Sequence, residues 1–165
     1  MTMPSDIGAI DLMIGFPAED ARRHYDFMKA NLKDEASAEM EFPAEYMFKE
    51  VPNHKEPEDD AIGITLAAMD ACGVAMGMVG LGSEVSKRAV AEHPHRFVGS
   101  IEVDPNDITG AVRKIRATHE EHGLSAVTTF PAGCIPQVPV SDRRYYPIYQ
   151  TCIDLGLPIV ANAGI

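Results

Sequence analysis

Short apolar runs alternate with amphipathic segments along the chain, and this alternation predicts strands that alternate with helices. The first apolar run, residues 9–14, stops at Gly15 and Pro17, as a buried strand does where a loop begins. Further strands are predicted over residues 74–79, 97–103, 124–130 and 158–163. Helices are predicted over residues 18–32, 59–72, 83–91, 106–123 and 144–155. This alternation indicates a parallel α/β architecture with right-handed crossovers.

Residue types at the segment ends support these helices. Gly73 stands where a left-handed C-terminal cap belongs, and Ser83 is suited to an N-cap. Asn106 is predicted to cap the helix that ends at Gly123. An open doubly wound sheet and a closed eight-stranded barrel both remain open. No Gly-x-Gly-x-x-Gly pattern follows the first strand, so the sequence lacks the dinucleotide-binding fingerprint.

One domain is predicted over residues 1–165, with a long segment at 33–60 inside it. That segment is charged and contains Pro43, Pro52 and Pro57, which makes it a long loop. A lid over a binding site and a surface excursion are both compatible with its composition.

The amino-acid composition indicates which kinds of binding partner are unfavourable. The net charge of −11 argues against nucleic acid or an anionic membrane surface as a partner. No apolar run is long enough to span a membrane, and the N-terminus lacks a secretory signal pattern. The three cysteines are odd in number and far apart, which favours a reducing cytoplasm. A small-molecule substrate is the expected partner.

Six short motifs occur in a fixed order along most of the chain. They are Ile10-Asp11 before a Pro-ended loop, then residues 71–74 (Ala-Cys-Gly-Val), 95–99 (His-Arg-Phe-Val-Gly), 103–106 (Val-Asp-Pro-Asn), 144–149 (Arg-Tyr-Tyr-Pro-Ile-Tyr) and 156–160 (Gly-Leu-Pro-Ile-Val). Their order resembles the amidohydrolase-related family that includes aminocarboxymuconate semialdehyde decarboxylase and the resorcylate decarboxylases. The resemblance implies a (β/α)8 barrel of roughly 250 residues or more. The chain then supplies about five βα units from the N-terminal portion of such a barrel.

Three explanations for the missing strands stay open: an expressed fragment, a truncated chain and a split gene. In each case the first and fifth strands are expected to present unpaired edges. A homo-oligomer, or a complementing chain that completes the barrel, is therefore a possible partner.

The resemblance also implies a divalent metal, held by Asp-x-His-x-His at the end of the first strand and by a His at the end of the fifth. Asp11 is present here, but the His positions fall on Met13, Gly15 and Asn162. A thioether suits soft metals, glycine has no side chain, and a single amide oxygen is a weak ligand. We expect neither this metal nor any other cofactor.

Polar residues at the carboxyl ends of the strands are the candidate catalytic residues, because barrel active sites form there. Glu102 is the predicted general base, with Asn162 and Asp11 as further catalytic residues. Asp104 has a simpler interpretation as a turn or helix-cap residue. The predicted substrate-binding residues are Met13, Gly15, Phe16, Thr128 and Thr129. The threonine pair is also ordinary for a strand.

The remaining metal-binding and nucleophilic side chains have structural interpretations. His93 and His95 have the spacing of a metal pair but precede the third strand, on the face of a barrel opposite its active site. His119 and His122 fall in the last turns of a helix, where a partial positive charge suits the dipole. Cys134 has no His nearby in sequence to activate it.

Two functions are compatible with this sequence. The first is a metal-independent hydrolase or decarboxylase-like lyase that acts on a small carboxylated or cyclic organic acid. The second is a non-catalytic barrel that binds a small molecule or serves as a structural subunit. The retained polar residues favour the first function, whereas the loss of three ligand positions is compatible with both.

Overall fold

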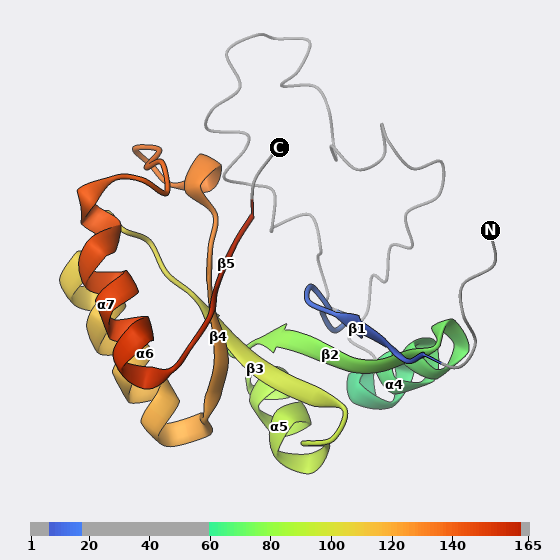
Figure 1. Ribbon diagram of the computed structural model, residues 1–165. Helices are drawn as coiled ribbons and strands as arrows, with labels where there is room; N and C mark the ends of the chain where they lie inside the picture. The colour runs from blue at the N-terminus through green and yellow to red at the C-terminus, as the bar shows by residue number, and fades with distance from the viewer. Residues whose placement is uncertain (1–6, 18–59, 163–165) are drawn as a thin grey trace, which may run out of the picture. The chain divides into compact units, whose positions relative to one another are not determined.

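The computed structural model describes residues 7–17 and 60–162. Its five strands form one parallel sheet in sequence order (Figure 1). They are β1 (Ala9–Asp11), β2 (Val74–Gly80), β3 (Phe97–Glu102), β4 (Leu124–Thr129) and β5 (Ile159–Ala161). The helices are α4 (Ala61–Cys72), α5 (Glu84–Glu92), α6 (Ile108–His122) and α7 (Tyr146–Leu155), with short 3-10 turns η2 (Pro131–Gly133) and η3 (Arg143–Tyr145). The predicted helix over 18–32 and nearly all of the predicted loop over 33–60 lie outside the described residues.

The register fixes which side of the sheet each side chain occupies, because paired residues on neighbouring strands point the same way. Val79 pairs with Gly99, and Met78 pairs with Val98. Two residues after Gly99, on the same side, Ile101 pairs with Val127. The Val79–Gly99–Ile101–Val127 side therefore carries the buried apolar residues, and we call the opposite side the inner face.

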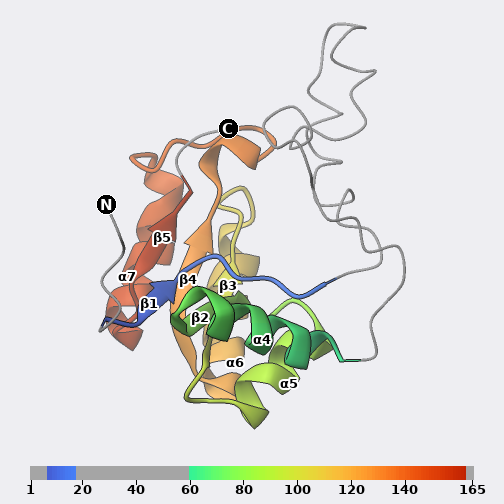
Figure 2. The ribbon, with the colours of Figure 1, turned by 90° about the vertical axis from the view of Figure 1, so that its right-hand side faces the viewer.

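All four helices cover the side opposite the inner face. Ile62 and Met69 of α4 and Ala89 of α5 pack in one core cluster with Val79 and Phe97. A second cluster joins the sheet to α6 and α7; its largest fully buried members include Ile115, Val127, Tyr145 and Ile148. Figure 1 shows α6 and α7 side by side against β4 and β5, and Figure 2 shows α4 near α5 toward the β2 end.

This arrangement decides between the two architectures that the sequence left open. A doubly wound sheet has helices on both faces and reverses its strand order at a switch point. Here the strand order is sequential, and the helices of residues 60–162 all pack on one side of the sheet, which is the arrangement of a (β/α)8 barrel. The prediction of a partial barrel is confirmed.

Two local predictions about helix caps had different outcomes. Ser83 is the N-cap of α5, and its side-chain oxygen accepts a hydrogen bond of 3.1 Å from the backbone N–H of Ser86. The prediction that Asn106 caps α6 is wrong. The carboxylate of Asp107 accepts the backbone N–H of Gly110 at 2.9 Å, one residue later than predicted. This leaves the Asn106 side chain available for contacts between loops.

None of the helices in the described part of the chain is long and apolar enough to cross a lipid bilayer.

Candidate functional site at the carboxyl ends of the strands

Three of the predicted site residues lie on the inner face at the carboxyl edge of the sheet. Glu102 at the end of β3 pairs with Thr128 of β4, so both side chains lie on this face. Thr128 in turn pairs with Val160 of β5, and Asn162 follows two residues later with the same orientation. The backbone N–H of Asn162 donates to the carbonyl of Thr129 at 2.9 Å, which extends the sheet to that residue. Glu102, Thr128 and Asn162 therefore form one polar row across three strands.

Glu102 is exposed at this edge. The ammonium of Lys114 on α6 donates a hydrogen bond of 3.0 Å to the backbone carbonyl of Glu102, not to its carboxylate. Among the residues that the structure describes, the Glu102 carboxylate has no hydrogen-bond or ion-pair partner. It is therefore available to a bound molecule, with a cation close by.

Thr129 lies on the opposite side of the sheet from Thr128, because successive residues of a strand alternate. Its side chain is only 1% exposed, and its hydroxyl donates to the carbonyl of Val103 at 3.2 Å. The same oxygen lies 2.9 Å from the hydroxyl of Tyr145, which is fully buried and can donate to it. These contacts give Thr129 a structural role, and substrate binding by Thr129 stays a prediction.

The predicted site residues around β1 are arranged differently. Asp11 pairs with Gly77, which pairs with Phe97, so Asp11 belongs to the helix-covered side. One oxygen of its carboxylate accepts the backbone N–H of Met13 at 2.8 Å, which closes a turn at the end of β1. The structure therefore does not bring Asp11 into the row of Glu102, Thr128 and Asn162.

The three remaining predicted residues follow this turn. Met13 is 76% exposed, and a Cβ placed on Gly15 would meet no atom within 4 Å. Phe16 packs its ring edge-on against Phe97, with the ring centroids 5.5 Å apart. Met13 and Gly15 thus lie open to solvent, whereas Phe16 contributes to the core cluster of α4 and α5.

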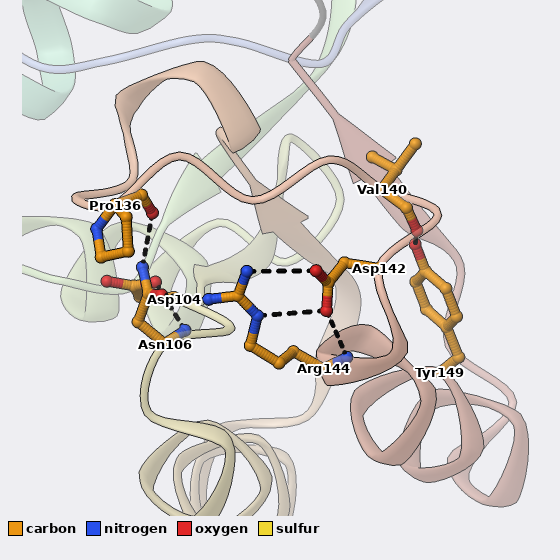
Figure 3. Close-up of polar contacts among 7 residues, drawn as sticks. All are labelled: Asp104, Asn106, Pro136, Val140, Asp142, Arg144 and Tyr149. Carbon is orange, nitrogen blue, oxygen red and sulfur yellow. Dashed lines mark hydrogen bonds and ion pairs between the residues drawn. The ribbon is translucent and has the colours of Figure 1, made fainter.

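A hydrogen-bonded network that the sequence analysis did not single out joins two loops at the carboxyl edge (Figure 3). Arg144 donates from Nε and Nη2 to the two carboxylate oxygens of Asp142, at 3.1 Å each. Its Nη1 donates to the side-chain oxygen of Asn106 at 2.8 Å. These hydrogen bonds from Arg144 hold the pKa of Asp142 down at about 2. The sequence signal was the spacing Asp-x-Arg just before a helix.

Cys134 lies in the loop after β4, and its thiol donates to the carbonyl of Phe130 at 3.3 Å. Burial raises the pKa of Cys134 to about 11, with further contributions from the nearby carboxylates of Asp104 and Glu102. The cation of Arg144 acts in the opposite direction. At neutral pH this thiol is protonated, so the structure gives no support to a nucleophilic role for it.

A family model described as amidohydrolase matches residues 16–165. The chain belongs to the amidohydrolase family. The resemblance predicted from the six motifs is thereby confirmed.

Two solved structures of one enzyme share the fold. One is a variant of 5-carboxyvanillate decarboxylase from Novosphingobium aromaticivorans DSM 12444, with bound manganese and 3-methoxy-4-hydroxy-5-nitrobenzoic acid. It superimposes with a TM-score of 0.60 at 16% identity over 94% of this chain and 50% of its own length. A second structure of that enzyme has bound manganese and 4-hydroxy-3-methoxy-5-nitrobenzoic acid. It superimposes with a TM-score of 0.59 at 16% identity, over 96% of this chain and 53% of its own length. This chain thus spans about half the length of that enzyme. A comparison with curated proteins found no match.

The described residues of this chain do not fit a divalent metal at the end of β1. Asp11 is engaged in its backbone turn, Met13 offers a thioether, and Gly15 offers no side chain. Within residues 7–17 and 60–162, no group of three or more His, Cys, Asp or Glu side chains is placed to hold a metal ion. His93 and His95 lie 6.4 Å apart, ring to ring, just before β3 and hence at the opposite edge of the sheet. Metal independence stays a prediction.

Proposed function

We propose that this chain forms part of a hydrolase or lyase that acts, without the family's divalent metal, on a small carboxylated aromatic or cyclic organic acid. The observation that carries this proposal is the polar row of Glu102, Thr128 and Asn162 on the inner face. Membership of the amidohydrolase family and the fold shared with a decarboxylase of an aromatic acid give it the reaction class and the substrate class.

In this proposal Glu102 is the residue that transfers the proton in the reaction. For a decarboxylation, the bond between the ring carbon and the carboxylate breaks and CO2 leaves. The electron pair of that bond stays on the ring carbon. Glu102 in its protonated form then delivers a proton to that carbon, and water restores the acid. For a hydrolysis, the Glu102 carboxylate takes a proton from the water that attacks the carbonyl carbon of a lactone or amide. The bond from that carbon to the leaving oxygen or nitrogen then breaks, and Glu102 returns the proton to the leaving atom. Thr128 and Asn162 hold a polar group of the substrate by hydrogen bonds.

The test uses the full-length protein treated with chelator, with its metal content measured by elemental analysis. A panel of arylcarboxylates, lactones and amides is assayed for CO2 release or ring opening. We expect turnover by the metal-free protein, and a loss of 10²-fold or more in Glu102→Gln. Glu120→Gln, which changes an exposed carboxylate on α6, serves as the matched control and keeps its activity. Activity that requires stoichiometric manganese or zinc, or no turnover of any panel member, would overturn the proposal.

The alternative is a non-catalytic barrel that binds a small molecule or serves as a structural subunit. The absence of metal-binding side chains at Met13 and Gly15 is as compatible with this alternative as with metal-independent catalysis. Saturable binding of a panel member without turnover would support this alternative over catalysis. Light scattering tests the predicted homo-oligomer or complementing chain, because β5 pairs only with β4 among the described strands. A monomer in solution would remove the homo-oligomer.

A further inference from the structure

Arg144 occupies an unusual place for a surface arginine, because it joins two separate loops at the carboxyl edge. It lies in η3, just before α7, and Asp142 of the same turn orients it from two sides. The carboxylate of Asp142 also accepts the backbone N–H of Arg144 at 2.9 Å. The guanidinium then reaches Asn106 in the loop between β3 and α6, 38 positions away in sequence. A planar group held in this way has little freedom left.

Asn106 forms two further hydrogen bonds, one to each of the two loops. Its side-chain amide donates to the carbonyl of Pro136 at 2.9 Å, so it ties the loop after β4 a second time. Its backbone N–H donates to the carboxylate of Asp104 at 2.9 Å. Asp104 is the first carboxylate beyond Glu102, and it lies beside the thiol of Cys134, whose loop Asn106 also holds. Figure 3 shows Asn106 between Arg144 and Pro136.

We propose that Arg144 is a positioning residue of this edge: through Asn106 it fixes the loop after β3 against the loop after β4, and so sets where the Asp104 carboxylate stands. The inference deepens the proposed function and rests on it, because Asp104 follows Glu102 by two residues at the carboxyl edge and both carboxylates lie near the thiol of Cys134. Lysine does not replace Arg144 here, because an ammonium cannot engage both oxygens of Asp142 and Asn106 in one plane.

A second ion pair, away from the carboxyl edge, provides a matched control. Arg116 of α6 and Asp154 of α7 join the two helices at 3.2 Å. Like Arg144 and Asn106, this pair links elements 38 positions apart in sequence. Arg116 lies in the middle of α6 and Asp154 in the last turn of α7, whereas the loops that Arg144 joins lie at the carboxyl ends of the strands. Arg116→Gln therefore removes a comparable contact without touching the carboxyl edge.

The experiment measures the pH profile of iodoacetamide alkylation at Cys134, located by peptide mass, in the full chain with Cys72→Ser. The charged groups that act on this thiol are Asp104, Glu102 and Arg144. With Arg144 in place, Asp104→Asn removes a carboxylate beside the thiol, and we expect the profile to move to lower pH. In an Arg144→Gln background we expect Asp104→Asn to leave the pH profile where it is, because Asp104 is then no longer held beside the thiol. Loss of the Arg144 cation also acts on the thiol directly. That direct effect is the same with Asp104 and with Asn at position 104, so it cancels when the two shifts of the profile are compared.

The outcomes separate a positioning role from a general structural one. An equal movement in both backgrounds would overturn the proposal, as would its loss in Arg116→Gln. Should Arg144→Gln fail to fold by circular dichroism, Asn106→Ala breaks the same connection from the other side and must abolish the movement. The readout needs no turnover, so failure of this inference and failure of the proposed function are distinguishable.

Discussion

The buried hydroxyl pair of Thr129 and Tyr145 gives the sharpest stability prediction. Thr129→Val keeps the shape of the side chain but leaves the Tyr145 hydroxyl, 0% exposed, without its partner, and removes the donor to Val103. A buried polar group left unpaired costs about 1–3 kcal/mol, so we expect a loss of about 2 kcal/mol in the free energy of unfolding. Tyr145→Phe costs less, about 1 kcal/mol, because Thr129 still donates to the Val103 carbonyl.

The double variant tests the reasoning directly. Once both hydroxyls are absent, no unpaired hydroxyl remains, and we expect a total loss of about 2 kcal/mol instead of the roughly 3 kcal/mol of the separate losses. Urea unfolding of the four proteins supplies these values. Tyr149→Phe is the control, because its hydroxyl donates to the Val140 carbonyl at the surface, and it changes stability by about 0.5 kcal/mol or less. Unchanged stability in Thr129→Val would refute the structural role and restore substrate binding as its explanation.

Three further predictions concern separate parts of the fold. The pKa of Asp142, about 2 against an ordinary 3.8, means that its ionised form stabilises the fold above about pH 4 and that this contribution disappears toward pH 2. Asp142→Asn should therefore lower the urea midpoint at pH 6 but not near pH 2, and an equal loss at both would contradict this. A Cβ on Gly99 would stand 2.6 Å from Leu81, so Gly99→Ala should cost about 1–3 kcal/mol, whereas Gly80→Ala, which meets open space, serves as its control. At pH 8 the thiol of Cys134, with a pKa of about 11, should react with iodoacetamide far more slowly than free cysteine; equal rates would show an ionised thiol.

Periodicity in the sequence was enough to predict the strands and helices of the described region, because each strand is an apolar run and each helix has a marked end. Boundaries shifted where a side chain competes with the backbone. The first strand was predicted to reach residue 14 but ends at Asp11, whose carboxylate binds the backbone N–H of Met13. The last helix begins at Tyr146 and not at residue 144, because Arg144 belongs to a 3-10 turn closed by Asp142.

The candidate site was only partly predictable for a related reason. Residue type identified Glu102, Thr128 and Asn162, which the register then places on one face. Thr128 and Thr129 were both predicted to bind substrate because both carry a hydroxyl. Successive residues of a strand point to opposite faces, so only one of the two can lie on the inner face. The role of Arg144 depends on a partner in another loop, and no local pattern in the sequence identifies such a contact.

The sequential order of the strands also affects how this protein is made. Each described strand pairs with the strand synthesised just before it, and the helix between them packs on the sheet that already exists. Because each strand pairs with its predecessor, a ribosome can release this chain one βα unit at a time onto a growing edge. During synthesis the newest strand always lies at one exposed edge of the sheet. A pause after any βα unit would therefore leave a strand edge open to pairing with a neighbouring nascent chain.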